Sequence, residues 1–312
     1  MTGMRRSGKS DDDWIRGVAN LATQQFDELR PLMFSIAYRM LGSVTEAEDI
    51  IQEAFIRMYG PDAGEARSPE ALATTVTTRL AIDHLRSARV RRERYVGAWL
   101  PEPLITADES SDPAHRVEVD ETVSMAFLVL LENLSPVERA VFLLRDVFAY
   151  DNQRIAEIVG KSEANCRQIL VRARRRIDER RPRFEASRER RDELARRFLT
   201  ACETGDTRAL ERLLADDVVF YGDGGGKAPA VTRPVTGAPQ VARFMLGIAR
   251  QVAAVGGRFE PTEVNGQPGA RLVDAAGRLG AVLEITIAAG HVRGLRNVLN
   301  PDKLGHLGLP LL

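Results

Sequence analysis

The sequence predicts two all-α domains followed by an α+β domain. Apolar residues recur with the 3.6-residue period of helices through the first half of the chain. A short helix, a glycine and a second helix follow one another near residue 160, which is typical of a helix-turn-helix. Beyond residue 215, short runs alternate between apolar and polar residues as strands do. At 312 residues with 44% hydrophobic and 28% charged residues, the composition is that of an ordinary globular protein of two or three domains.

The composition also excludes several classes of protein. Two cysteines, Cys166 and Cys202, cannot form a disulfide framework. No run approaches the roughly 20 apolar residues of a membrane span, and no apolar segment follows the basic N-terminal residues as in a secretory signal. We therefore expect a cytoplasmic protein. The 44 basic and 44 acidic residues cancel, so the total charge does not indicate nucleic-acid binding. Arginine codons favoured by genome composition are as good an explanation of the many arginines as selection for binding.

The first predicted domain covers residues 18–96 and contains three helices. The first ends at Gly42, and Thr45 begins a T-E-A-E capping box with Glu48 at the third position. Gly60-Pro61 ends the second helix. Ser68-Pro69 starts the third. That third helix runs into the first arginine cluster: Arg86, Arg89, Arg91, Arg92 and Arg94.

An acidic linker containing prolines is expected at 97–118, before a second helical domain at 119–186. In the second domain Ser135 is an N-cap, followed by Pro136 at the first position and Glu138 at the third. The helix-turn-helix comprises Asn152–Val159, Gly160 and a helix that starts near Ser162. Composition alone suggests that the acidic linker could mimic phosphate charge.

The third domain, 190–312, is expected to begin with a helical stretch over 190–214. Strands are predicted at Val218–Tyr221, Arg258–Val264, Ala270–Asp274, Leu279–Ala288 and His291–Leu299, with a helix over Gly237–Val255 between them. The alternation in Leu279–Ala288 predicts a strand with one buried face. Helices followed by such a sheet make an α+β domain.

The second helix of a helix-turn-helix enters the major groove, where its first residues contact base edges. Acidic, amide and arginine side chains all have base-edge partners there, and later arginines can neutralise phosphates. The base-contacting candidates are Glu163, Asn165, Arg167 and Gln168, and the phosphate-contacting ones are Arg172, Arg175 and Arg176. The alternative is a structural hairpin with solvated arginines. In the first domain, Asp49, Gln52 and Glu53 line an acidic face that is either solvated or a docking surface for a basic partner.

Two blocks together resemble the extracytoplasmic-function sigma factors of bacterial RNA polymerase. AEDIIQEAF and TTRLAIDHLRSARVRRE are similar to their domain two, and LSPVERAVFLLRDVFAYDNQRIAEIVGKSEANCRQILVRARRRI is similar to their domain four. The resemblance implies binding to core RNA polymerase and promoter DNA. It implies that the β′ clamp helices of the polymerase are bound by Asp49, Gln52, Glu53 and Phe55. It implies that the −10 element is contacted by Arg79, Asp83, His84, Arg86 and Arg89. The −35 element would be contacted by the seven helix-turn-helix residues given above.

The chain departs from the family at one position. Leu72 stands where many members carry a tryptophan early in the −10-associated helix. Aromatic side chains stack on unpaired bases, so the way this chain stabilises melted DNA differs. The loop Gly60–Arg67 is a candidate pocket for an extruded base.

The C-terminal domain resembles the SnoaL-like cone of the nuclear-transport-factor-2 superfold, and the mycobacterial sigma J type of sigma factor carries such a domain. Three motifs support this: WLPEP at 99–103, DGGGK at 223–227 and NPDKL at 300–304. The resemblance implies regulation in cis. The implied regulatory contacts are Trp99, Leu100, Pro101, Asp223, Gly224, Gly225, Gly226, Lys227, Asn300, Pro301, Asp302 and Lys303. A small-molecule ligand in the cone is a further candidate partner.

Two other functions fit parts of the sequence. A ligand-sensing repressor or activator would use the helix-turn-helix without polymerase, but it leaves the acidic face at 46–53 unexplained. A cyclase or isomerase would use Tyr221, Asp223, Glu284 or His291 for acid–base chemistry, but it leaves residues 25–180 unexplained. The histidines are scattered, so we expect no metal, no cofactor and no enzymatic activity.

Overall fold

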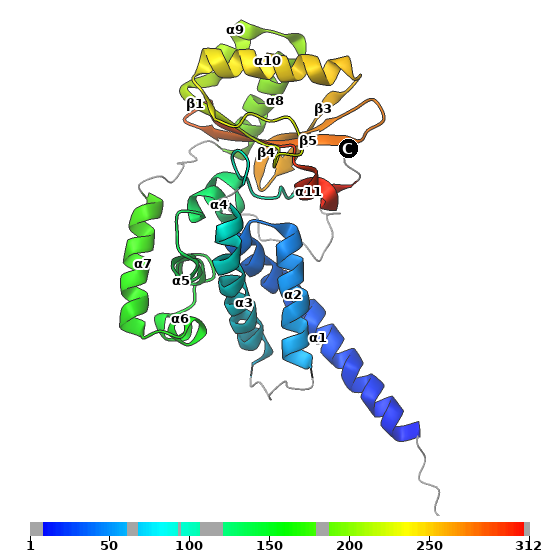
Figure 1. Cartoon of the computed structure of the whole chain (residues 1–312), viewed down its shortest axis with the longest axis vertical. Coiled ribbons are helices and arrows are strands. Elements are labelled where there is room, and N and C mark those ends of the chain that lie inside the picture. Colours follow the sequence, from blue (N-terminus) through cyan, green and yellow to red (C-terminus); the bar gives the residue numbers. More distant parts are fainter. Residues whose placement is uncertain (1–8, 61–67, 93–94, 107–120, 179–186, 309–312) are drawn as a thin grey trace, which may run out of the picture.

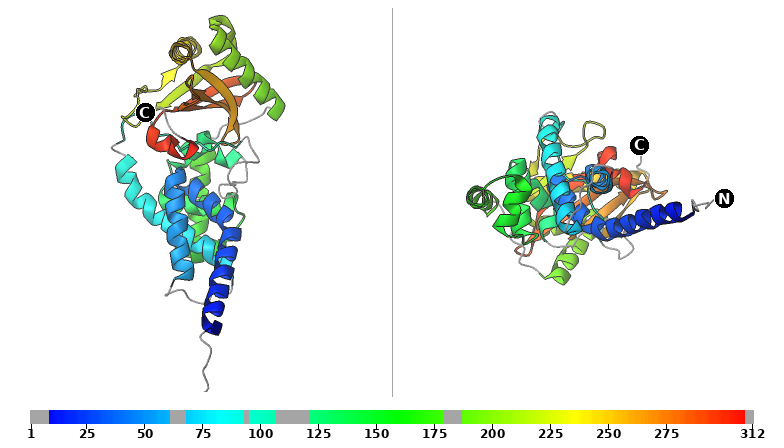
Figure 2. Two further views of the ribbon diagram at one scale, coloured as in Figure 1. Left: turned by 90° about the vertical axis from the view of Figure 1, so that its right-hand side faces the viewer. Right: turned by 90° about the horizontal axis from the view of Figure 1, so that it is seen from below.

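The computed structural model describes residues 9–60, 68–92, 95–106, 121–178 and 187–308. A helical part and a sheet-containing part are stacked along the long axis of the molecule (Figure 1). The chain between them, coloured cyan, runs under the sheet beside the C-terminal helix α11 (Figures 1 and 2). The sequence predicts this fold class correctly.

Three helices form the first part of the chain: α1 (Lys9–Leu41), α2 (Val44–Tyr59) and α3 (Pro69–Arg92). Gly42 adopts a positive φ of 67° and ends α1 as predicted. The predicted capping box at Thr45 is wrong. Ser43 is the N-cap of α2, because its backbone is extended and its Oγ accepts the Glu46 N–H at 3.1 Å.

The second helical part contains a 3₁₀ turn η2 (Glu121–Val123), α4 (Met125–Leu131), α5 (Pro136–Asp146), α6 (Asn152–Val159) and α7 (Glu163–Asp178). Ser135 and Glu138 form the predicted capping box at the start of α5. Gly160 has a φ of 66° and joins α6 to α7 in the predicted helix-turn-helix.

The two helical parts share one hydrophobic core, to which Phe34 of α1, Leu80 of α3, Phe142 of α5 and Ile158 of α6 all contribute. The buried Arg139 guanidinium donates to the carbonyl oxygen at the end of α1 (Met40, 2.5 Å). The two parts are therefore packed as one body in this structure, although the sequence divides them by a linker.

The C-terminal part begins with α8 (Arg188–Thr204) and α9 (Thr207–Leu213), not the single helical stretch predicted, because Gly205 ends α8 with a φ of 74°. A six-stranded sheet follows in the order β2-β1-β6-β5-β4-β3. Only β1 and β6 are parallel. The strands are β1 (Leu214–Asp223), β2 (Val235–Thr236), β3 (Arg258–Val264), β4 (Gln267–Val273), β5 (Leu279–Ala288) and β6 (His291–Val298).

Helices α8, α9 and α10 (Ala238–Ala254) cover the sheet face that points away from the helical part (Figure 1). Short helices α11 (Pro301–Leu304) and η3 (Gly305–Leu307) lie at the opposite face. The prediction that β5 has one buried face is wrong, since nearly all of its residues are buried. The outer face of β5 is covered by the helical part. There, Glu284 accepts the Met125 N–H of α4 at 3.1 Å.

Candidate functional site

The predicted polymerase-binding face lies on α2. Asp49 and Gln52 are exposed, and Glu53 pairs with Arg57 one turn later at 2.9 Å. Phe55 packs edge-on against Phe26 of α1, with ring centroids 4.7 Å apart. The helix therefore presents an acidic surface beside a partly buried aromatic group.

The predicted −10 residues lie on α3 in three different settings. Asp83 and Arg86 form an exposed pair with each other at 2.8 Å. His84 contacts Glu46 of α2 at 3.0 Å. The side chain of Arg89 and the loop 61–67 lie outside the described residues.

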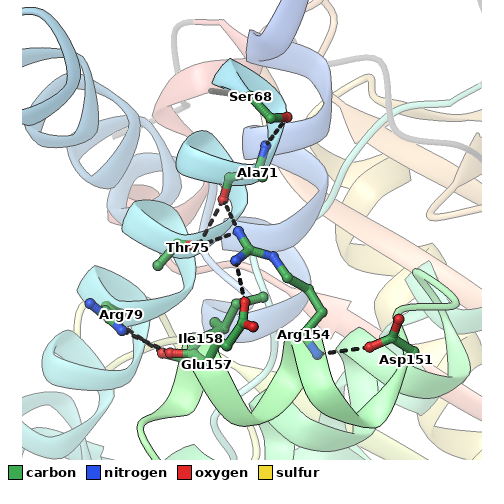
Figure 3. A network of polar contacts seen from close by, with 8 residues as sticks. All are labelled: Ser68, Ala71, Thr75, Arg79, Asp151, Arg154, Glu157 and Ile158. Atoms are coloured by element: carbon green, nitrogen blue, oxygen red, sulfur yellow. Dashed lines mark hydrogen bonds and ion pairs between the residues drawn. The ribbon is translucent and has the colours of Figure 1, made fainter. Parts of the chain in front are cut away.

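Arg79 of α3 points into the helix-turn-helix. Its guanidinium donates to the carbonyl oxygens of Ile158 and Glu157, both at 2.8 Å, at the C-terminal end of α6 (Figure 3). These carbonyls carry the negative end of the helix dipole, so a cation is favoured there. Arg79, which was predicted to contact DNA, thus binds another helix of the same chain in this structure.

Arg154 of α6 makes the reciprocal contact, and the sequence analysis missed it. Its guanidinium reaches α3, where it donates to the Ala71 carbonyl at 2.5 Å and to Thr75 Oγ1 at 2.8 Å (Figure 3). Thr74 and Tyr150 share a further hydrogen bond at 2.9 Å. Five hydrogen bonds between described residues therefore join α3 to the region of the helix-turn-helix.

The predicted −35 residues lie on α7, and all seven are exposed: Glu163, Asn165, Arg167, Gln168, Arg172, Arg175 and Arg176. Glu163 pairs with Arg167 at 2.6 Å, and Arg176 pairs with Glu138 of α5 at 2.9 Å. The opposite side of α7, including Cys166, is buried in the core. The helix thus exposes one polar, arginine-rich face.

The three predicted regulatory motifs meet around one carboxylate. Asp223, at the end of β1, is buried and accepts hydrogen bonds from the Leu100 N–H at 2.8 Å and the Tyr95 hydroxyl at 2.5 Å. It also pairs with the buried Lys303 ammonium at 2.7 Å. Lys303 donates to the Leu100 carbonyl and lies 4.3 Å from the Trp99 ring centre. The linker is thereby attached to the C-terminal domain.

Asn300 and the glycines complete this attachment. Asn300 Nδ2 donates to the Tyr95 hydroxyl at 2.8 Å. Burial, and then the neighbouring Asp223 carboxylate, raise the pKa of Tyr95, so its hydroxyl stays a donor. A Cβ on Gly224 would lie 2.2 Å from the Ala228 carbonyl oxygen, and one on Gly225 would lie 2.2 Å from the Asn300 amide. These glycines are therefore required by close packing.

The other predicted motif residues lie nearby. Lys227 and Asp302 form an exposed ion pair at 2.6 Å. Pro101 is buried in the linker, Pro301 begins α11, and Gly226 has a φ of 73°.

Glu102 follows the attached linker segment and binds the first domain. Its carboxylate accepts from the Ser43 hydroxyl at 2.7 Å and from the N–H groups of Val44 and Thr45 at 2.8 and 3.0 Å. A carboxylate at the first N–H groups of α2 is favoured by the helix dipole. Glu102 is therefore not available as a phosphate mimic, which corrects the expectation for this acid. Residues 107–120, with the other linker acids, lie outside the described residues.

None of the four acid–base candidates in the C-terminal domain lines the cavity between α10 and the sheet. Asp223 holds the linker, and Glu284 accepts from Met125 and Arg296. His291 is exposed at a turn, and Tyr221 packs near Arg296. Within the described ranges, no group of three or more His, Cys, Asp or Glu residues is arranged to hold a metal ion. Every described helix is too short or too polar to cross a bilayer.

Comparison with known proteins identifies the family. The models Sigma-70 region 2 and Sigma-70, region 4 match residues 25–91 and 124–177. The chain is 38% identical to the ECF RNA polymerase sigma factor SigJ of Mycobacterium tuberculosis, over 93% of this chain and 95% of that protein. The chain belongs to the extracytoplasmic-function sigma factors. Sigma factors of this family act with core RNA polymerase at promoter DNA, and this is the function of the chain at that level.

Two further similarities cover most of the chain. It is 34% identical to the probable ECF RNA polymerase sigma factor SigI of Mycobacterium tuberculosis, over 89% of this chain and 93% of that protein. The crystal structure of SigJ matches with a TM-score of 0.75 and 35% identity, covering 93% of this chain and all of that one. The similarity to SigJ thus extends through the C-terminal α+β domain.

Proposed function

We propose that this sigma factor reads −10 and −35 promoter elements and that its C-terminal domain controls this reading in cis. In this proposal residues 18–96 are domain two, 97–118 the linker, 119–186 domain four and 190–312 the regulatory domain. The exposed face of α2 docks on the polymerase clamp helices, α3 serves the −10 element, and α7 serves the −35 element.

The arrangement of α3 and α7 supports a mechanism in which domains two and four must move apart before the promoter is recognised. The two elements lie about 25 base pairs apart, or roughly 85 Å of duplex at about 3.4 Å per base pair. In the structure α3 is joined to α6 by hydrogen bonds, and α6 packs on α7. An α-helix of 16 residues is only about 24 Å long. The two reading helices must therefore separate before one molecule can occupy both elements.

The C-terminal domain is placed to oppose this separation. The Asp223 carboxylate is the observation that carries the proposal, because it fixes the start of the linker through Tyr95, Leu100 and Lys303. A few residues later, Glu102 fixes the same linker to α2. The linker is thus held between the C-terminal domain and domain two. The C-terminal domain also binds domain four, because Glu284 accepts the Met125 N–H at 3.1 Å, so it limits how far domains two and four can move apart.

The polymerase-docking face is left accessible by this closed arrangement, since Asp49 and Gln52 remain exposed. Arg79, by contrast, is engaged with α6. We therefore propose that polymerase can dock on α2 while promoter reading is still restrained.

In-vitro transcription with core polymerase tests the proposal, using DNA from upstream of the gene for this protein. The Asp223→Asn variant leaves Lys303 buried without its counter-charge and should loosen the linker. We expect start-site-specific transcript to increase at least about threefold. Asp217→Asn is the matched control, because Asp217 pairs with Arg293 at the exposed surface of the same domain.

The Arg154→Ala variant removes two of the hydrogen bonds between α3 and α6 without touching the C-terminal domain, and it should also raise transcription. Unchanged transcript from both variants, with wild-type helix content by circular dichroism, would refute control in cis. Tight binding to duplex DNA with no transcript from any form would instead favour a repressor or activator that acts without polymerase.

A further inference from the structure

A cavity of about 770 Å³ lies between α10 and the sheet of the C-terminal domain. Its walls are mainly aliphatic and aromatic side chains, among them Phe220, Phe244, Ile248, Val252, Leu272 and Ala281. Small-ligand sites usually have volumes of about 300–1,000 Å³ and similar apolar walls. The cavity therefore has the size and surface of a small-molecule site.

Asn297 of β6 places a buried amide within these walls. Its side chain lines the cavity and is 2% exposed, and its amide oxygen is buried without a hydrogen-bond partner. Almost all buried polar side chains in proteins are hydrogen-bonded, and an unpaired one costs stability. A leucine at this position would suit the surrounding apolar residues better. The amide oxygen is therefore positioned to accept a hydrogen bond from a ligand in the cavity.

The three other polar side chains in the cavity wall, those of Asp274, Arg243 and Gln251, do not offer a comparable site. The Asp274 carboxylate accepts from the backbone N–H groups of Ala276 and Arg278 and from the Arg278 guanidinium, at 2.8–2.9 Å. Arg243 and Gln251 are exposed to solvent. Recognition inside the cavity therefore depends on Asn297.

The cavity and the linker share one loop. Pro229, Ala230 and Val231 form part of the cavity wall. On its other side this loop contacts the linker, since Gly97 faces the Val231 carbonyl and Gly226 faces Val96, with 3.9 and 3.5 Å to a Cβ built on each glycine. The loop also follows directly from Asp223, which holds Leu100. Movement of this loop would therefore displace the linker residues that lie against it.

We propose that the cavity binds a mainly apolar small molecule carrying a hydroxyl group, which pairs with the Asn297 side chain, and that loop 224–234 transmits occupancy to the linker. A hydroxyl both donates and accepts, so it can pair with either end of the amide. The proposal is independent of promoter recognition, because binding and linker protection are measured without polymerase or DNA.

The binding test compares two fluorescent probes of nearly equal size, 2-naphthol and 2-methylnaphthalene, titrated against the full-length protein. We expect saturable binding of both and at least about fivefold tighter binding of 2-naphthol. In Asn297→Leu this preference should disappear while 2-methylnaphthalene still binds. The same variant should also melt at a higher temperature in the absence of probe, because it removes the unpaired amide. A lower melting temperature would show that Asn297 has a structural partner and would overturn the proposal.

A second variant narrows the cavity without disturbing the fold. Gly247 lies on α10 in the cavity wall, and a Cβ built on it meets no atom within 4 Å. Gly247→Leu should therefore fold normally and bind both probes more weakly than the wild type. Ala253→Leu is the matched control, since it adds a similar side chain to the exposed side of the same helix. No saturable 2-naphthol binding to the wild type, or equal binding to Gly247→Leu, would overturn the proposal.

Hydrogen exchange measured by mass spectrometry tests the link to the linker. Saturating 2-naphthol should change the exchange rate of the peptide containing the Leu100 amide, which is bonded to Asp223. The Gly247→Leu variant should show a smaller change at the same 2-naphthol concentration. An unchanged rate in the wild type at saturation would overturn transmission through loop 224–234.

Discussion

Asn265 and Tyr38, 227 residues apart, are joined by a buried hydrogen bond of 2.7 Å from the Asn265 amide to the Tyr38 hydroxyl. The same amide donates to the Val123 carbonyl at 2.8 Å and accepts the Leu104 N–H at 2.9 Å. Burial raises the pKa of Tyr38, so its hydroxyl stays protonated and donates to the Glu102 carbonyl at 2.7 Å. One side chain of the β3–β4 turn thus connects α1, the linker and the start of the second helical part.

The Asn265→Gly variant tests how much this junction contributes to stability. Asn265 has a φ of 52°, which glycine adopts freely, so the variant removes only the side chain. It leaves the Leu104 N–H and the Val123 carbonyl without partners, and each buried unpaired group costs about 1–3 kcal/mol. We expect the free energy of unfolding in urea to fall by about 2–4 kcal/mol.

Ala289→Gly is the matched control, because Ala289 also has a positive φ, 50°, but lies at an exposed turn. Its stability should stay level or rise by about 1 kcal/mol as strain is relieved. A neutral Asn265→Gly would mean that the three parts of the molecule do not depend on this junction.

Glu102→Gln tests the linker as a cap for α2. The glutamine keeps one acceptor oxygen but loses the negative charge at the helix N-terminus. Such charges and caps each contribute about 0.5–2 kcal/mol. We expect a loss of about 1–2 kcal/mol in the free energy of unfolding, whereas Glu203→Gln, at an exposed site on α8, should be neutral. Equal effects of the two substitutions would contradict a capping role.

Local sequence signals predicted most elements of this fold. The capping residues Ser135 and Glu138 begin a helix, Gly160 forms the turn of the helix-turn-helix, and the alternating runs became strands. Each of these signals acts within a few residues, so periodicity and capping reveal it.

The errors arose where distant segments decide the outcome. Ser43 displaced Thr45 as the N-cap of α2, and the bond from Ser43 to Glu102 spans 59 residues. Burial of the outer face of β5 depends on Met125, 159 residues from Glu284. Arg154 was missed because an arginine in a helix-turn-helix suggests DNA, and nothing in the local sequence indicates that it contacts α3. The regulatory motifs were found by resemblance, but only the structure shows that they converge on Asp223.

The two thiols should be unreactive in the native protein. Burial is the main cause that raises the pKa of Cys202, to about 12, and burial also raises the pKa of Cys166. Thiolate is the reactive form, so little of either side chain can react at pH 8. We expect almost no thiol to react with Ellman's reagent in the native protein and two equivalents of thiol to react after unfolding. Rapid reaction of one thiol without denaturant would show that its helix, α7 or α8, opens locally.

The capping box of α5 should make stability depend on pH. Burial opposes ionisation of Glu138, but hydrogen bonds from the Ser135 backbone and hydroxyl, together with the Arg176 guanidinium, outweigh it and lower the pKa of Glu138 below its ordinary value of 4.5. The folded pKa lies below the unfolded one. The ionised side chain therefore contributes stability above pH 4.5, and the contribution is lost as pH falls through the folded value.

Glu138→Gln should accordingly lower the free energy of unfolding by about 1 kcal/mol at pH 7, the usual size of a capping contribution. The difference from wild type should shrink as pH falls below 4.5, because the wild-type carboxyl then becomes protonated. Urea unfolding at pH 7, 5, 4 and 3 measures this. A difference that stays constant across the series would mean that the glutamate acts through packing and not through its charge.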